Sequence, residues 1–187
     1  SILSGELVLG DNAPRMDINE IPSPYLEGLL DKFFTPQTMP LIQTNRGCPY
    51  SCTYCTEGKS YYNKVSFKDV DHTVEEIRYI AKKNIGSQNL NIADSNFGMY
   101  KRDIEICRAI AEMQDTYNWP KYIHVAVGKN NKKRVLEAAK IIRGALRLSA
   151  SIQSMDPIVL ENIQRKNISS VEIIETAQEG KTIGSNT

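Results

Sequence analysis

The chain has 187 residues, of which 41% are hydrophobic and 24% charged, and its net charge is +1. This composition is typical of one globular domain with a real core. A near-neutral chain without a basic stripe gives no sign of a nucleic-acid partner. The apolar runs are too short for a transmembrane helix, and no signal peptide is recognisable at the N-terminus. We therefore expect no membrane contact and a cytoplasmic location.

Residues 1–39 are rich in proline and indicate a linker or connector around one short amphipathic segment, residues 25–34. From residue 40 onward, short apolar runs alternate with amphipathic helices. The runs predict strands, and the periodic segments between and after them predict helices. The predicted strands are residues 41–45, 89–93, 122–127 and 146–152, and the predicted helices begin near residues 73, 102, 132, 157 and 170.

Four strands that alternate with helices predict an α/β fold of parallel β/α repeats. Residues 40–187 hold only about four such units, which leaves either a small open sheet or part of a larger barrel. The predicted buried faces of the first three helices are Val74, Ile77, Ile80 and Ala81, then Ile104, Cys107, Ile110 and Ala111, then Val135, Ala138, Ala139 and Ile142.

Capping patterns mark several helix ends. Thr73-x-x-Glu76 and Ser169-x-x-Glu172 have the form of capping boxes. Asp156-Pro157 predicts a helix that runs to about residue 166, and Gly184 predicts the end of the last helix.

Three of the four cysteines, Cys48, Cys52 and Cys55, are spaced C-x3-C-x2-C directly after the first predicted strand. Functional loops follow the carboxyl ends of parallel strands, and clustered cysteines in a cytosolic chain favour metal binding or catalysis over disulfides. Zinc sites and ferredoxin clusters usually have four protein ligands. Cys107 is expected to be a small buried hydrophobe and His124 a packed side chain. The three thiols therefore indicate a cubic iron-sulfur cluster with one iron open to another ligand, and the alternative is a zinc or electron-transfer site that stabilises a binding module.

The loop Cys48, Cys52, Tyr54 and Cys55 resembles the signature of the radical S-adenosylmethionine (SAM) superfamily, and the resemblance covers residues 40–187. It implies a partial, TIM-like barrel without its fifth and sixth strands. The cysteines would bind a [4Fe-4S] cluster whose open iron chelates SAM. An external electron donor of the flavodoxin or ferredoxin type would drive reductive cleavage of SAM to a 5′-deoxyadenosyl radical. Tyr54 would shelter the cluster with its backbone near the adenine, or simply pack the loop as a surface aromatic.

The same resemblance suggests further SAM contacts. The family's second strand often ends in Gly-Gly-Glu, whereas this chain has Asp94, Ser95 and Asn96 there. Ser95 and Asn96 would then be the SAM-binding side chains, and Asp94 could instead cap a turn. Gln153 would reach the SAM ribose, with Ser151 beside it, although a strand-end hydrogen bond is the plainer interpretation of Gln153.

The segment before the first strand, INEIPSPYLEGLLDKFF, resembles the connector of radical SAM enzymes that carry a cobalamin-binding domain upstream. Cobalamin is therefore expected in the parent protein, and the isolated chain is expected to bind its cofactors poorly. Its last strand would be an open edge, or be covered by the N-terminal segment or a second copy. Lys129 follows the third strand and either lines the pocket or lies on a solvated face. The substrate, a small molecule or another class, is not readable from these residues.

Overall fold

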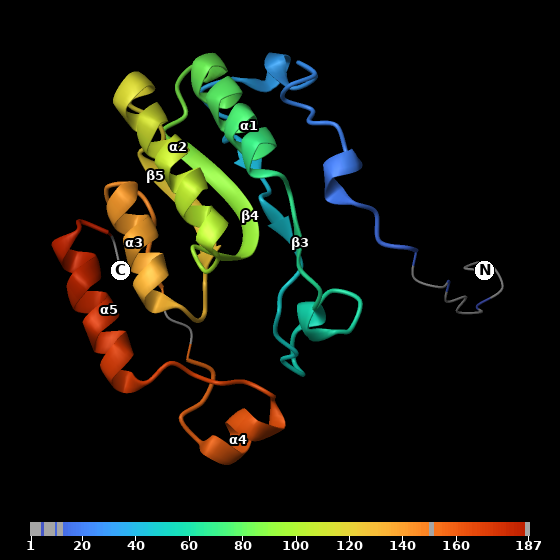
Figure 1. The fold of residues 1–187 in the computed structure, drawn as a ribbon, viewed down its shortest axis with the longest axis vertical. Helices are drawn as coiled ribbons and strands as arrows, with labels where there is room; N and C mark the ends of the chain where they lie inside the picture. Colours follow the sequence, from blue (N-terminus) through green and yellow to red (C-terminus); the bar gives the residue numbers. More distant parts are fainter. Residues whose placement is uncertain (1–4, 6–9, 11–12, 150–151, 186–187) are drawn as a thin grey trace.

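The computed structural model describes Gly5, Gly10 and residues 13–149 and 152–185. Figure 1 shows a row of helices lying against a short sheet, with the cysteine loop and α4 beyond one end of the sheet. In chain order the elements are η2 (Ile18–Glu20), η3 (Asp31–Phe33), β1 (Leu41–Ile42), β2 (Asn45–Arg46), η4 (Thr56–Gly58), β3 (Ser66–Phe67), α1 (Val70–Lys83), β4 (Asn89–Phe97), α2 (Lys101–Tyr117), β5 (Tyr122–Val127), α3 (Lys132–Ile141), α4 (Pro157–Asn162) and α5 (Ser170–Thr182).

The main sheet has the order β1-β4-β5, and both pairings are parallel. A single parallel bridge from Ile123 to Leu146 continues it beyond β5. The predicted α/β fold of parallel β/α repeats is therefore confirmed. Two predicted strands are shorter than expected: β1 has only two residues, and the predicted strand 146–152 is represented by the bridge at Leu146, with residues 150–151 outside the described residues.

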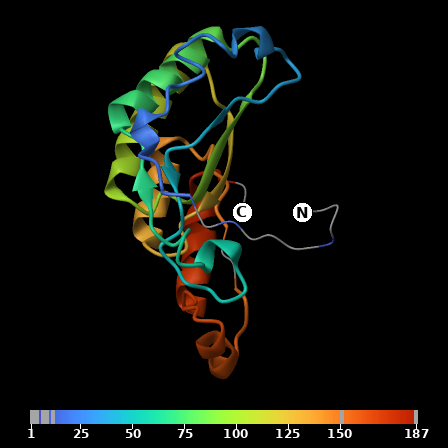
Figure 2. The same cartoon turned by 90° about the vertical axis from the view of Figure 1, so that its right-hand side faces the viewer.

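The helices cover one face of this sheet, as the side view in Figure 2 shows. The core side chains Leu90, Ile92 and Ile123 point toward them and are at most 2% exposed. On the other face Tyr122 is 55% exposed, and the exposed His124 ring contacts Asn89 Oδ1 through Nε2 at 2.9 Å. The expectation that His124 is packed is therefore wrong, because alternation along β5 turns it to the uncovered face.

A second, two-stranded sheet pairs β2 with β3 in antiparallel register, Asn45 with Phe67 and Arg46 with Ser66. The sequence predicted one strand over residues 41–45, but the chain leaves the main sheet after Ile42 and joins this small sheet instead. The pairing closes the base of a long loop, residues 47–65, which contains the three clustered cysteines.

The first helix begins earlier than predicted. Its N-cap is Asp69, and Thr73 lies inside the helix, where its hydroxyl donates to the Asp69 carbonyl at 2.8 Å. Glu76 is buried and accepts from Lys68 Nζ at 2.6 Å. The predicted Thr73-x-x-Glu76 capping box is therefore wrong, because both side chains are used one turn into the helix.

The other helix signals are largely confirmed. Ser169 and Glu172 form the predicted capping box of α5, and Asp156 caps α4, which ends at Asn162 rather than near residue 166. Gly184 has the left-handed φ of 72° expected after a helix end. Of the predicted inner faces, all but Val74 and Ala111, which are only half-buried, belong to the buried core: Ile77, Ile80, Ala81, Ile104, Cys107, Ile110, Val135, Ala138, Ala139 and Ile142.

Each edge of the main sheet is met by a hydroxyl group. At β1, Tyr25 Oη donates to the Leu41 carbonyl at 2.9 Å and accepts from the Leu41 amide at 3.0 Å. At the other edge, Ser185 Oγ donates to the Leu146 carbonyl at 2.6 Å and accepts from the Leu148 amide at 3.2 Å. The edge at Leu146 was expected to be open or covered by the N-terminal segment or a second copy. In the single chain Ser185, three residues after the end of α5, contacts it.

In the part of the chain that the structure describes, no helix is both long enough and apolar enough to span a bilayer.

Candidate functional site

The cysteine loop is held in shape by close backbone approaches. Gly47 has a φ of 101°, and a Cβ there would lie 2.4 Å from the Lys64 carbonyl oxygen. A Cβ on Gly58 would lie 2.2 Å from the Cys52 carbonyl oxygen. The Cys48 amide donates to the Tyr62 carbonyl at 3.1 Å across the loop. Glycine is thus required on both sides of the C-x3-C-x2-C motif because the backbone crosses itself there.

The three thiols differ in exposure. Cys48 is 2% exposed and Cys52 5%, whereas Cys55 is half-buried. Among the residues that the structure describes, no three His, Cys, Asp or Glu side chains lie close enough together to hold a single metal ion. Cys107 is fully buried in α2, where desolvation raises the pKa of its thiol, so it is the small hydrophobe that its helical position predicted.

Asp94, near the end of β4, joins the sheet to the base of the cysteine loop. Its Oδ1 accepts from the amides of Thr44 at 2.8 Å and Asn45 at 3.2 Å. Its Oδ2 accepts from Asn45 Nδ2 at 2.8 Å and from the Thr44 hydroxyl. Burial raises the pKa of this carboxyl group in spite of these donors. Asp94 is therefore a structural residue that fixes where the chain leaves the main sheet.

The next two polar residues of β4 contact the cysteine loop itself. Ser95 Oγ donates to Glu57 Oε1 at 2.6 Å, and Glu57 belongs to η4 within the loop. Asn96 is 1% exposed, and its Nδ2 donates to Cys48 Sγ at 3.3 Å. Both predicted site residues thus lie beside the cysteines. Their predicted contacts with SAM stay predictions.

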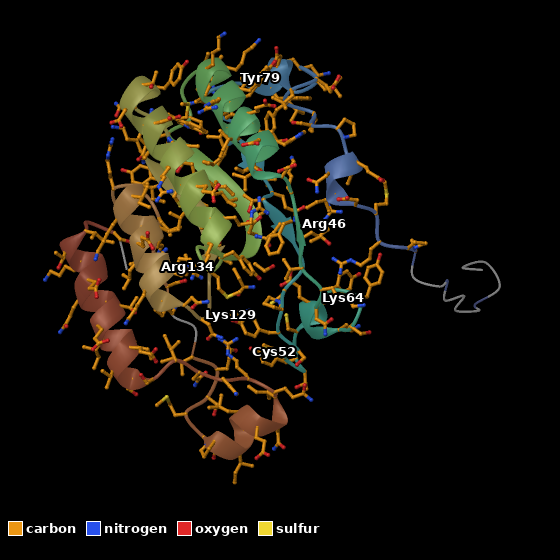
Figure 3. The ribbon with its side chains drawn as sticks, viewed as in Figure 1. Arg46, Cys52, Lys64, Tyr79, Lys129 and Arg134 are labelled. Carbon is orange, nitrogen blue, oxygen red and sulfur yellow. The ribbon has the colours of Figure 1, made fainter. Side chains whose placement is uncertain are left out.

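Lys129 also lies beside the cysteines, in the segment after β5. Its Nζ is 3.8 Å from Cys48 Sγ and 5.5 Å from the centre of the Tyr50 ring. Tyr50 Oη in turn donates to Met99 Sδ at 3.3 Å. Figure 3 shows Lys129 and Cys52 at the same end of the molecule, and both line one cavity. Of the two interpretations of Lys129, the pocket-lining one is confirmed, whereas Tyr50 was missed because an aromatic beside a cysteine has no distinctive spacing.

The segment around α4 covers the loop from another side. The Thr53 amide donates to the Ile163 carbonyl at 3.2 Å, and Arg165 Nη1 donates to Tyr54 Oη at 3.3 Å. Tyr54 is 52% exposed. Of the two predicted ribose contacts, Gln153 is exposed, and Ser151 lies outside the described residues. The role of α4 was not visible in the sequence, because these contacts join segments about a hundred residues apart.

Two adjacent cavities have volumes of about 80 and 210 Å³, and loop residues line the larger one. They share Lys129, Arg165 and Lys166, and Lys132 lines the smaller one, whereas none of the described residues lining either cavity is a carboxylate. Desolvation lowers the pKa of Lys132. Cavities lined by several cations, the larger of which also includes Cys52, suit a ligand that carries negative charge.

The donor set fits an iron-sulfur cluster. Soft thiols are the preferred ligands of such clusters, and hydrogen-bond donors to the sulfurs are part of how proteins hold and tune them. Here three thiols lie in one loop, and an amide and an ammonium group contact one of them. The loop lies where parallel α/β folds place their sites, beyond the carboxyl ends of the strands. Fold and site together define an α/β protein with a thiol-rich cofactor loop.

Comparison with known protein families identifies the family within this class. The family model described as the radical SAM superfamily matches residues 42–186. Because this match covers most of the chain, including every predicted site residue, the chain belongs to the radical SAM superfamily.

Two curated relatives are similar over 87% of the chain. One is a 2-(S-pantetheinyl)-carbapenam-3-carboxylate methyltransferase from Streptantibioticus cattleyicolor, with 38% identity. The other is the cobalamin-dependent radical SAM methyltransferase TokK from Streptomyces tokunonensis, with 35% identity. The chain spans 25% of the length of each relative.

Solved structures share the fold at low identity. The radical SAM methyltransferase TsrM from Kitasatospora setae has a TM-score of 0.62 at 14% identity, over 82% of this chain and 30% of that one. The cobalamin-dependent radical enzyme OxsB has a TM-score of 0.61 at 19% identity, over 98% of this chain and 27% of that one. The segment before the sheet therefore has a counterpart in the OxsB fold.

Proposed function

We propose that this chain is the cluster- and SAM-binding part of a cobalamin-dependent radical SAM methyltransferase that acts on a small molecule. The observation that carries the proposal is the cysteine loop held against the end of β4, with Cys48 contacted by Asn96 and Lys129. The identity of 38% to a methyltransferase over 87% of the chain favours methyl transfer over the other radical reactions.

In this proposal Cys48, Cys52 and Cys55 are the protein ligands of a [4Fe-4S] cluster. When bound, the cluster supplies the electron for reductive cleavage of SAM, and cobalamin supplies the methyl-carrying chemistry. Cys48 and Cys52 are at most 5% exposed, which limits water around these two thiols. Glu57 and Ser95 hold the loop against β4.

The SAM contacts of Tyr54, Ser95, Asn96, Ser151 and Gln153 are part of the proposal. The cations that line the two cavities are suited to a carboxylate of SAM or of the substrate. Lys132 already donates to two carbonyls, of Gly128 at 3.1 Å and Ser149 at 3.3 Å, which fixes its position at the cavity wall.

The wider setting is also proposed. Residues 1–39 would be the connector to a cobalamin-binding domain, residues 40–187 part of the barrel, and the working location the cytoplasm, with a flavodoxin- or ferredoxin-type protein as electron donor. Self-association would use the sheet edge at Leu146, although Ser185 contacts that edge in the single chain.

The test is anaerobic reconstitution of the 187-residue chain with iron and sulfide. We expect about four irons and four sulfides per chain, and a change in the EPR spectrum of the reduced cluster when SAM is added. A variant with Cys48, Cys52 and Cys55 all replaced by alanine should lose this iron. The matched control Cys107→Ala, which removes the fourth thiol, should keep it.

Two outcomes would count against the proposal. Stoichiometric zinc in place of iron, or iron content unaffected by the triple replacement, would exclude the cluster. A cluster whose EPR spectrum ignores SAM, both in this chain and in a longer protein that completes the barrel, would instead favour the alternative function, an electron-transfer or binding module stabilised by its metal.

A further inference from the structure

Cys48 is the most buried of the clustered thiols and is contacted by groups from two different strand ends. Asn96, on β4, donates through Nδ2 at 3.3 Å. Lys129, after β5, places its ammonium group 3.8 Å from the same sulfur. Both contacts join residues far apart in sequence, so the fold of the sheet, and not the loop alone, brings a donor and a positive charge to this thiol.

Asn96 is an unusual residue for its position. Its side chain is 1% exposed, and its Oδ1 is buried without a hydrogen-bond partner among the described residues. A buried polar atom left unsatisfied costs roughly 1–3 kcal/mol. Two residues earlier on the same face, Asp94 accepts from four donors. Stability alone therefore explains Asp94 but not Asn96, whose one side-chain hydrogen bond among the described residues goes to a cysteine sulfur.

Lys129 is held in place by its surroundings. Its ammonium group lies over the Tyr50 ring, 5.5 Å from the ring centre, in a cation–π contact that holds the side chain in place. Tyr50 is itself anchored through its hydroxyl to Met99 Sδ. The charge is thus directed at Cys48 rather than spread over a solvated surface.

A hydrogen-bond donor and a cation beside a thiolate ligand both stabilise negative charge on that sulfur. Reduction of a cluster by one electron adds one negative charge, part of which resides on its sulfur ligands. Groups that stabilise this charge favour the reduced state, and the hydrogen bonds and charges around the sulfurs are among the factors that set the potentials of iron-sulfur clusters.

We propose that Asn96 and Lys129 are positioning residues that act through Cys48 to raise the reduction potential of the cluster, and so make its reduction by a one-electron donor easier. This inference rests on the proposed function, because it requires the three cysteines to hold the cluster. It adds a role for Lys129, and a role for Asn96 that is separate from any contact with SAM.

The test is a potentiometric titration of the reconstituted 187-residue chain with dithionite, followed by EPR in the absence of SAM. Asn96→Leu keeps the approximate volume and removes the donor. Lys129→Gln keeps a polar side chain and removes the charge. For each variant we expect about a tenfold less favourable reduction equilibrium, which for a one-electron couple corresponds to a midpoint about 59 mV lower.

Two controls separate this effect from a general change in the cavity. Lys132→Gln removes a cation from the same cavity wall, but one that donates to backbone carbonyls, and it should leave the midpoint close to that of the wild type. Lys129→Arg keeps the charge and should have a midpoint close to that of the wild type. If Asn96→Leu fails to fold, the three lysine variants, which lie in a partly exposed segment, decide the question.

The outcomes distinguish this inference from the proposed function. A wild-type sequence that binds no cluster, either as this chain or within a longer protein that completes the barrel, overturns both. Normal iron content with unchanged midpoints in Asn96→Leu and Lys129→Gln overturns the inference and leaves the proposed function standing. A shift of equal size in Lys132→Gln also overturns it, because the effect would then belong to the overall charge of the cavity.

Discussion

The helix-covered face of the sheet and the cysteine loop are stabilised in different ways. Behind the sheet, Ile77, Ile110 and Val135 are fully buried in a continuous apolar core. The loop, residues 47–65, contains one short 3-10 helix, η4, and is closed at its base by two-residue strands. Backbone crossings at two glycines, two polar contacts to β4 and two to the segment after α4 hold the rest. The core thus supplies the apolar burial that stabilises the fold, whereas the loop, which carries the proposed cluster ligands, has little apolar burial of its own.

The largest expected effect on folding lies in the core. Ile110→Ala removes a fully buried side chain between α2 and the sheet, and should lower the free energy of unfolding by about 2–5 kcal/mol in urea titrations. Iron bound per folded chain should stay unchanged. The matched control Ile174→Ala, at a position 57% exposed on α5, should change the unfolding free energy by no more than about 0.5 kcal/mol. Loss of iron from the folded Ile110→Ala protein would show that core stability and iron binding by the loop are not independent, and would contradict the prediction.

A pH-dependent effect is expected at Asp103, a fully buried residue near the start of α2. Its Oδ2 accepts from the Tyr100 amide at 3.0 Å, but burial raises the pKa of its carboxyl group to about 6. The folded protein thus keeps this proton at pH values where the unfolded chain, with a pKa of about 3.9, has released it. The free energy of unfolding contributed by Asp103 therefore falls as pH rises from about 4 through 6.

The measurement compares the wild type with Asp103→Asn, which cannot ionise. Between pH 4.5 and 7.5, the wild type should lose about 2 kcal/mol of unfolding free energy relative to the variant. A difference between the two proteins that is constant with pH would show that Asp103 titrates alike in the folded and unfolded states, and would contradict the prediction.

A substitution in the loop is expected to have the smallest effect on the free energy of unfolding and a large effect on the amount of bound iron. In Gly58→Ala the new Cβ would lie 2.2 Å from the Cys52 carbonyl oxygen, so the backbone between two cysteines must move. We expect a loss of less than about 1 kcal/mol in unfolding free energy, because the loop buries little apolar surface, but loss of most of the bound iron. Gly10→Ala, where a Cβ meets nothing within 4 Å, is the control and should bind iron normally. A Gly58→Ala protein with full iron content would show that the loop tolerates rearrangement.

Sequence patterns predicted the repetitive parts of this fold well. The inner face of α3, with Val135, Ala138 and Ala139, follows from helical periodicity alone. The capping box at Ser169 and Glu172 was also correct, because both partners are local. The equivalent pattern at Thr73 and Glu76 failed because Asp69 begins the helix earlier and Lys68 engages Glu76. Local signals of this kind cannot report a competing partner that tertiary structure supplies.

The proposed cluster ligands form a local pattern in the sequence, whereas the residues around them do not. The spacing of Cys48, Cys52 and Cys55 is contained in eight residues and carries its meaning locally. The contact between Asn96 and Cys48 spans 48 positions, and that between Lys129 and Cys48 spans 81. No periodicity or motif in the sequence predicts either contact. Each depends on how the β2–β3 pairing directs the loop over the ends of β4 and β5.

The hydroxyl groups of Tyr25 and Ser185 have a consequence for how the sheet can grow. Each hydroxyl donates one hydrogen bond to, and accepts one from, the backbone at an edge of the sheet. A neighbouring strand would otherwise make these backbone hydrogen bonds. A further strand that docks beside Leu146 must first displace the Ser185 hydroxyl. Adding a strand at that edge therefore replaces the two Ser185 hydrogen bonds with new ones. The free energy gained by adding the strand is smaller by the contribution of those two hydrogen bonds.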